Sequence, residues 1–251
     1  MKITHRSNFA SVLIAAIAIS AGLLLSGSRA TAQQAPALKE RLAEIKAASA
    51  QNKQQLATYT WQEQDTISLK GEVKKQESYQ VRMGPDGKPQ KTPMNAGQAA
   101  EQPNQAASQG RRGGRMKQKI VENKKEEYKE YGQNMAALAH SYVPPDPAKL
   151  QQAFQQGNVK LGEGAASNQV QLLITNYVKP NDSMTLTFDK SAKAIQSVQI
   201  GSYMDSPSDA VKIGVQFAKL PDGTNHVANM SIDGVSKQLK VDIANSNYKK
   251  L

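Results

Sequence analysis

The sequence predicts an α+β domain in which a curved antiparallel sheet, an incomplete barrel of about eight strands, is covered by amphipathic helices. Three observations predict this class. The second half of the chain is a series of short runs that alternate apolar and polar residues. Turn residues separate these runs, and the connections are too short for crossover helices, so the strands must be antiparallel. Two longer segments in the first half carry apolar residues at helical spacing.

The first 32 residues have the pattern of a cleaved export signal. Lys2 and Arg6 precede an apolar run over residues 12–25, and residues 30–32 (Ala-Thr-Ala) have the small-x-small form that signal peptidase recognises. The run is shorter than the roughly 20 residues that a membrane span needs. We therefore expect cleavage near Ala32 and a periplasmic mature chain. An uncleaved N-terminal anchor is the alternative.

The composition of the chain excludes several kinds of site and favours some partners over others. The chain has no cysteine, which excludes disulfide scaffolds, zinc ribbons, thiol catalysis and lipidation at the cleavage site. Its formal charge is +11, and removal of residues 1–32 leaves +8 on one predicted domain, residues 33–251. This surplus favours contact with anionic membrane surfaces or acidic polymers. Nucleic acid is not expected as a partner, because the predicted compartment argues against it.

Three helices are predicted. The first, over residues 36–56, and the second, over residues 116–142, carry an apolar stripe at helical spacing with charged residues on the opposite face. Pro144 ends the second helix because proline cannot continue the hydrogen-bond ladder. Asp146 is expected to cap a short third helix over residues 147–156.

Between the first two helices, a period of two predicts strands over residues 58–70 and 72–83, joined by a turn at Gly71. One face of this pair is apolar, and on it lie Tyr59, Trp61, Ile67, Leu69, Val73, Tyr79, Val81 and Met83.

The segment that follows is predicted to be a disordered insert. Residues 95–115 are rich in Gln, Ala, Gly and Asn and contain no large apolar residue, so they cannot bury enough surface to offset the entropy cost of ordering. A basic run from Arg111 to Lys119 closes it. This run is interpreted as the solvated end of a linker, with contact to an anionic surface as the alternative.

Six strands are predicted in the second half of the chain, over residues 169–178, 184–188, 194–203, 210–220, 225–232 and 238–243. Asp-Gly pairs at residues 222–223 and 233–234 are strong hairpin signals. All but the strand at residues 194–203 place their large apolar residues on one parity. One large apolar sheet face therefore needs a cover, and the predicted helices are the available material.

This order of elements resembles that of the LolA/LolB-like lipoprotein-carrier superfamily. The segment from Leu186 to Ile195 looks like its strand, Asp-turn, strand element, and residues 217–223 and 247–250 are compatible with its last hairpins. The resemblance implies an incomplete barrel around a hydrophobic cavity, lidded by helices, that accepts acyl chains. The insert at residues 95–115 is not part of that pattern, and the arginine implicated in gating the lid of the carrier has no match.

No pattern of catalytic, metal-binding or cofactor-binding residues stands out. The histidines, His5, His140 and His226, lie apart in the sequence, and neither a phosphate loop nor a G-x-S-x-G, H-E-x-x-H or calcium-loop motif occurs. Acidic pairs such as Glu126–Glu127 are expected to be solvated charges. The sequence therefore predicts that the protein is not an enzyme and needs neither a metal nor a cofactor.

The predicted function is a non-enzymatic carrier or sensor that binds an apolar ligand, a lipid acyl chain or a lipidated protein, between sheet and helices. Apolar residues also fill ordinary cores, so a packed core is the alternative at these positions. In that case the protein is a basic binding module that contacts an acidic cell-envelope polymer or a protein partner through Lys212 and Lys240 on the polar face. The predicted ligand-binding residues are Trp61, Leu172, Ile174, Leu186, Phe188, Ile213, Val215, Phe217, Met230 and Ile232.

Overall fold

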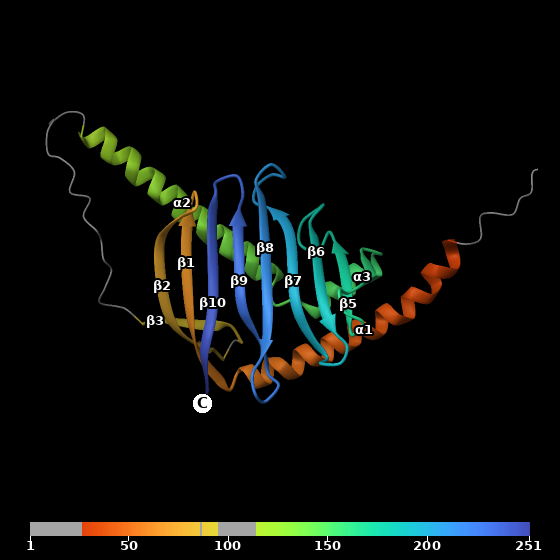
Figure 1. Cartoon of the computed structure of the whole chain (residues 1–251). Helices are drawn as coiled ribbons and strands as arrows, with labels where there is room; N and C mark the ends of the chain where they lie inside the picture. The colour runs from red at the N-terminus through yellow and green to blue at the C-terminus, as the bar shows by residue number, and fades with distance from the viewer. Residues whose placement is uncertain (1–26, 86, 95–113) are drawn as a thin grey trace, which may run out of the picture.

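The computed structural model describes residues 27–85, 87–94 and 114–251. In these ranges the chain forms three helices and one antiparallel sheet of ten strands, in the order β3-β2-β1-β10-β9-β8-β7-β6-β5-β4 (Figure 1). The sheet stays open, with β3 and β4 as its edges. The predicted α+β class and curved antiparallel sheet are confirmed. The elements are α1 (Gly27–Leu56), β1 (Tyr59–Leu69), β2 (Glu72–Met83), β3 (Pro89–Pro93), α2 (Gly114–Tyr142), α3 (Pro147–Gln155), β4 (Val159–Glu163), β5 (Gln169–Thr175), β6 (Ser183–Asp189), β7 (Ala194–Tyr203), β8 (Ala210–Lys219), β9 (Asn225–Gly234) and β10 (Leu239–Lys250).

The predicted number of about eight strands was wrong, because the two edge strands, of five residues each, are too short to show a period of two in the sequence. β3 begins and ends with proline and has no apolar alternation. β4 is a five-residue strand that follows α3 after a short turn at Gly157. Proline and short length are both tolerated at a sheet edge, where one row of backbone groups has no strand to pair with.

Cross-strand neighbours on one face of the sheet form continuous rows, most of whose members are apolar. The register places equivalent residues side by side from β1 at one end to β4 at the other. The first row consists of Ile67, Val241, Ile232, Ile213, Ile200, Met184, Ile174 and Val159. The second row consists of Asp65, Ile243, Met230, Val215, Val198, Leu186, Leu172 and Leu161.

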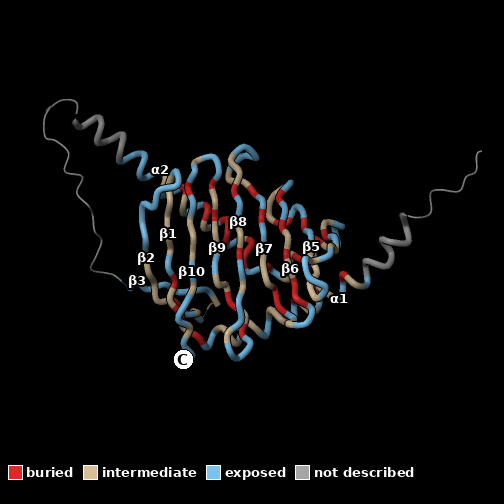
Figure 2. The backbone as a smooth tube through the Cα atoms, viewed as in Figure 1, coloured by how far each residue is buried: buried red, intermediate tan, exposed pale blue. Residues whose placement is uncertain are grey.

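The three helices lie on this face and complete the core. α2 crosses this face of the sheet diagonally. α1 runs past the ends of the strands that lie at the bottom of the view in Figure 1. Leu42 and Ile45 of α1, Met135 and Leu138 of α2, and Leu150 of α3 belong to the same buried cluster as the residues of the two rows. Figure 2 shows the alternation of buried and exposed positions along the strands that this packing produces.

The predicted strand at residues 194–203 lacks a clean alternation for a structural reason. The register between β6 and β7 shifts between Thr187 and Phe188, so one strand carries an extra residue. Ile195 and Val198 consequently both lie on the core face, opposite Phe188 and Leu186, although they are an odd number of positions apart in the sequence. A β-bulge of this kind hides the period of two without ending the strand.

Polar contacts at the ends of the strands hold α2 against the sheet. The Tyr131 hydroxyl donates to Asp209 Oδ1 at 2.7 Å, and the Tyr142 hydroxyl donates to Asp182 Oδ2 at 2.5 Å. Between them the helix approaches β9 so closely that a Cβ atom at Gly234 would lie 2.7 Å from Met135 Sδ. A side chain at this position would displace Met135 or Tyr131, so glycine allows α2 to pack closely against β9 here.

Some predictions concern residues that the structure does not describe. Of the predicted signal peptide, residues 1–26 lie outside the described residues, and α1 begins at Gly27, before the predicted cleavage site. The predicted insert also lies outside them, except for residues 114 and 115, with which α2 begins. No helix within the described ranges is long and apolar enough to span a membrane.

The two neighbouring leucines of β5 provide a test of the register. Leu172→Ala is expected to lower the free energy of unfolding by about 2–5 kcal/mol, because this side chain is 0% exposed in the core. Leu173→Ala is the matched control: its side chain is 41% exposed on the outer face, so the expected loss is below about 1 kcal/mol. Urea denaturation measures both. Equal losses would contradict the assignment of Leu172 to the core face.

Candidate binding site on the concave face

Most of the predicted ligand-binding residues lie in a packed core. Seven of them are at most 1% exposed and belong to one cluster with the helix side chains: Leu172, Ile174, Leu186, Phe188, Ile213, Val215 and Ile232. Phe217 of β8 and Met230 of β9 are only partly buried and pack at the border of this cluster. The structure therefore places these nine of the ten residues in or against one core, and it separates the fully buried ones from those at the border; Trp61 is not part of this cluster.

The border defines a half-covered end of the concave face, formed by the partly buried side chains of Ile67, Phe217, Met230, Val241 and Ile243. These residues come from β1, β8, β9 and β10 and continue the apolar rows of the core. α2 contacts β9 and β10 on one side of this end. On the other side, α1 reaches β9, where Asn52 Nδ2 donates to the backbone oxygen of Asn225 at 2.7 Å.

Sequence reasoning missed two acidic residues at this end, Glu63 and Asp65. Both lie on the concave face of β1, between Trp61 and Ile67, and Asp65 begins the second row. Glu63 is 7% exposed. The signal was available, because two carboxylates occupy the parity of the large apolar residues in the middle of a strand. Charged residues at such positions are rarely buried without a partner.

That partner is Lys91 of β3. Its ammonium contacts Glu63 Oε1 and lies 3.5 Å from Asp65 Oδ2. The Asp65 side chain is 15% exposed and the Lys91 side chain 35% exposed, so the cluster is screened from water on one side. Asp65 Oδ1 is buried without a hydrogen-bond partner among the described residues.

The surroundings shift the acid–base properties of this cluster. Burial raises the pKa of Asp65 to about 6, although Lys91 acts against this rise. Burial by itself would lower the pKa of Lys91, but the hydrogen bond and attraction to Glu63 raise it. Burial also raises the pKa of Tyr79 to about 12, with Glu77 adding to the effect. On α2, burial and the charge of Lys91 lower the pKa of His140.

Trp61 lies in a separate aromatic cluster, where β9 and β10 part. The pairing of these strands runs from Gly234–Leu239 to Asn229–Ala244, while both strands continue further. Side chains occupy the gap. The Trp61 ring stacks on Tyr248 with centroids 5.5 Å apart, and its Nε1 donates to Asn245 Oδ1 at 3.1 Å. The His226 ring lies 4.2 Å from Tyr248.

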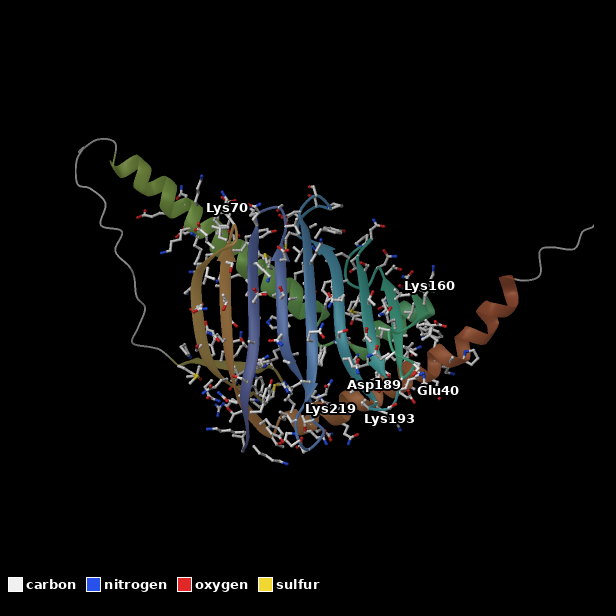
Figure 3. The ribbon with its side chains drawn as sticks, viewed as in Figure 1. Glu40, Lys70, Lys160, Asp189, Lys193 and Lys219 are labelled. Carbon is white, nitrogen blue, oxygen red and sulfur yellow. The ribbon has the colours of Figure 1, made fainter. Side chains whose placement is uncertain are left out.

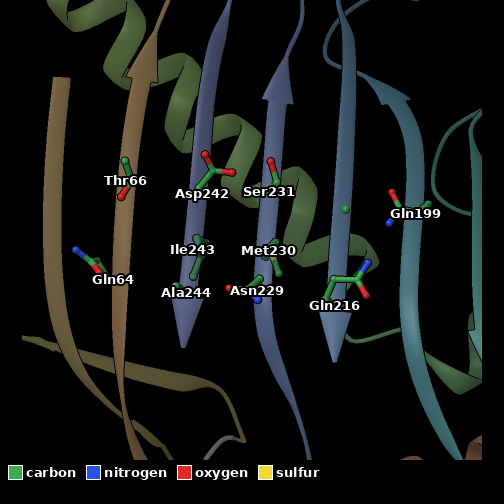
Figure 4. Close-up of a pocket in the computed structure, with 11 residues that line it drawn as sticks. Gln64, Thr66, Gln199, Gln216, Asn229, Met230, Ser231, Asp242, Ile243 and Ala244 are labelled. Atoms are coloured by element: carbon green, nitrogen blue, oxygen red, sulfur yellow. The ribbon is translucent and has the colours of Figure 1, made fainter. Parts of the chain in front are cut away.

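The outer face of the sheet is polar and shallow. One open hollow of about 330 Å³ crosses β1, β10, β9, β8 and β7 (Figure 4), and among the residues that line it are Gln64, Thr66, Gln199, Gln216, Asn229, Ser231 and Asp242. A second, of about 480 Å³, adjoins it at Gln199 and Gly214 and includes Lys212 and Lys240.

Charges on this face are balanced. Lys240 Nζ lies 2.9 Å from Asp242 Oδ1, and Lys212 faces Asp233 across the β8–β9 pair. Other charged side chains are found at strand ends and edges, as Figure 3 shows for Lys70, Lys160 and Lys219. In the described part of the chain, no three His, Asp or Glu side chains converge in a way that suits a metal ion.

The raised pKa of Asp65 predicts a pH-dependent effect of Asp65→Asn. Because the pKa lies near 6 in the folded chain and 3.8 ordinarily, ionised Asp65 lowers stability above pH 6, and this cost fades as the pH falls toward 4. Two pKa units correspond to about 3 kcal/mol, which partial hydration of the side chain reduces. We expect Asp65→Asn to raise the free energy of unfolding by about 1 kcal/mol at pH 7.5 and to change little near pH 4.

Urea denaturation at pH 7.5, 6.0 and about 4 measures this difference. Asp242→Asn on the outer face is the matched control, since that carboxylate is 43% exposed and its partner Lys240 is also solvated. A gain that is the same at every pH, or one that the control reproduces, would contradict the assignment of a strained carboxylate to Asp65.

Comparison with known proteins does not identify a family for this chain. No family model matches the chain, and no curated protein matches its sequence. Among solved structures, it is similar to a DUF1329 family protein from Desulfovibrio piger, with 13% identity, coverage of 85% of this chain and 92% of that chain, and a TM-score of 0.42.

Proposed function

We propose that the protein is a non-enzymatic carrier or sensor that holds an apolar ligand, such as a lipid acyl chain, at the half-covered end of the concave face. The observation that supports this proposal is the continuity of the apolar rows. Met230, Val241 and Ile243 continue the rows past the fully buried core, and their side chains stay partly exposed. A bound chain would cover these groups as the helices cover their neighbours.

The free energy gained by burying methylene groups is large enough for an acyl chain to bind at this end. Transfer of a methylene group from water to an apolar surrounding gains about 0.8 kcal/mol. A chain of about a dozen carbons that contacts this end over part of its length would therefore bind without a specific polar contact. The seven fully buried candidate residues form the wall behind the ligand in this proposal, and Phe217 and Met230 touch it.

The proposal also includes a cellular location and a relation to a protein family. A cleaved signal peptide would deliver the chain to the periplasm, and the surplus positive charge would bring it to anionic membrane surfaces. The half-open sheet with helices on one face is compatible with a distant LolA/LolB-like ancestry. A lipid or a lipidated protein is the partner that this proposal implies.

The alternative is contact between the outer face and an acidic polymer. The overall charge favours it, but the face itself does so less, because Lys240 pairs with Asp242 and Lys212 lies opposite Asp233. An ion-paired lysine attracts a polyanion less than a free one.

Binding of a fluorescent fatty acid tests the carrier proposal. We expect the purified protein to take up the probe, and Met230→Glu to weaken binding at least tenfold because the new carboxylate would lie in the ligand's path. Asn229→Glu is the matched control, since the neighbouring side chain is exposed on the outer face. It should bind the probe like the unaltered protein.

Circular dichroism must show that both variants fold, and the milder Ile243→Ala replaces Met230→Glu if that variant does not. Native mass spectrometry of the protein from the periplasm gives a second readout, in which a co-purifying lipid is expected. A ligand-free protein that takes up no probe would overturn the carrier proposal and favour the polymer-binding alternative.

A further inference from the structure

The edge strand β3 is attached to the sheet in an unusual way. All five of its residues are exposed, so it contributes little to the apolar core. It pairs with β2 from Tyr79–Pro93 to Met83–Pro89. Within the described residues, β3 reaches the interior through Lys91, whose ammonium contacts Glu63 and Asp65 on β1. The strand is thus held by its backbone ladder and by one ion-pair cluster.

The hairpin formed by β2 and β3 lies over the concave side and borders the half-covered end. β3 passes behind β1 as seen from the outer face (Figure 1), and the ion pairs place it on the same side as the helices. Its turn approaches the C-terminal part of α1, since a Cβ atom at Gly87 would lie 2.9 Å from Cε and Nζ of Lys53. The hairpin therefore bridges the sheet edge and α1 at the boundary of the proposed ligand site.

The charges that hold the hairpin do not balance when all groups are ionised. Two carboxylates, Glu63 and Asp65, share the ammonium of Lys91. On β2, Glu77 lies opposite Asp65 but is paired with Lys75 Nζ at 2.7 Å. The remaining groups that face this cluster are Tyr79 on β2, His140 on α2 and Tyr248 on β10.

We infer that the β2–β3 hairpin is a pH-dependent latch over the half-covered end, closed most firmly when the Glu63–Asp65–Lys91 cluster carries one extra proton. With that proton the cluster is neutral, and without it a negative charge remains in a partly dehydrated site, which favours a more open, hydrated hairpin. The inference rests on the proposed function only for what the latch encloses. The latch itself concerns contacts within the chain.

The direction follows from proton linkage. The pKa of Asp65 is near 6 in the closed state, and its ordinary value of 3.8 applies once the carboxyl group is hydrated. The closed state therefore holds the proton more tightly, and acidification favours closing. From pH 7.5 to 5.0 these two values increase the closed-to-open ratio roughly tenfold. Protonation of His140 beside Lys91 opposes this at the acid end, because the pKa of His140 is lowered in the closed state.

Hydrogen exchange of the full chain without ligand tests the inference. Between pH 7.5 and 5.0, and after correction for intrinsic exchange rates, the amides of residues 80–83 and 90–92 should become up to about tenfold better protected. The amides of β6 and β7 serve as the internal reference and should not change. Trp61, the only tryptophan, pairs with Val81 of the hairpin, so its emission should shift with a midpoint near pH 6.

Variants separate the latch from a general effect of pH. Asp65→Asn should give strong hairpin protection at both pH values, and Lys91→Met should weaken protection about tenfold or more at pH 7.5. Asp242→Asn, a paired carboxylate on the outer face, should behave like the unaltered chain. His140→Gln should extend the closing to lower pH.

Two results would overturn the latch: hairpin protection that does not change with pH relative to β6 and β7, or the unaltered pH dependence in Asp65→Asn. If Asp65→Asn does not fold, Lys91→Met and the Trp61 titration of the unaltered chain decide in its place. Neither readout needs a ligand. Failure of fatty acid uptake would therefore leave the latch standing, and a pH-independent hairpin would leave the carrier proposal standing.

Discussion

One constraint shapes the rest of the structure: the apolar face of the sheet is not buried evenly. The rows of cross-strand neighbours continue from β4 to β1, and the described helices contact β4, β7, β9 and β10. In these rows the side chains of β5 to β8 are all buried, whereas Met230 of β9 and Val241 and Ile243 of β10 are only partly buried. Burial of apolar area is the main stabilising contribution to folding, so any group that covers the remaining part is bound favourably.

The same constraint explains the charged residues at the uncovered end. At the β1 end of the rows, the positions between Trp61 and Ile67 on the concave face carry carboxylates instead of aliphatic side chains. An ion pair in such a place adds little net stability, because the loss of hydration offsets most of the attraction. Its effect is instead on arrangement: it draws the exposed edge strand β3 onto the concave side and gives it a preferred position.

Aspartates in the short connections keep the rows aligned. Asp182 accepts hydrogen bonds from the backbone N–H groups of Tyr177, Val178 and Lys179, and Asp189 accepts from Ser191 and Ala192. Carboxylates that accept hydrogen bonds from nearby backbone N–H groups stabilise a turn relative to other local conformations.

Alignment matters because a slip of one residue would move a whole strand's apolar side chains to the outer face. Asp182 also accepts from the Tyr142 hydroxyl of α2, so one buried side chain connects a turn of the sheet to the helix that covers it. The turn and the docking of the helix therefore stabilise each other.

Local sequence patterns were sufficient to predict the class of the fold and the face of the sheet on which the candidate residues lie. Local patterns carry this information: a period of two, a helical stripe and turn residues such as Asp-Gly depend on neighbours in the chain. They predicted the three helices and eight of the strands. They did not show β3 and β4, whose five-residue segments become strands only because a neighbouring strand is present to pair with.

The tertiary structure alone decided which apolar residues are covered and which remain accessible. Leu172 and Met230 have the same pattern in the sequence, and only the position of the helices makes one fully buried and the other partly exposed. It also decided the partners of Glu63 and Asp65, because Lys91 comes from an edge strand that no periodicity marks. Contacts between segments far apart in the chain are not encoded in local spacing, and both the half-covered end and its charged border consist of such contacts.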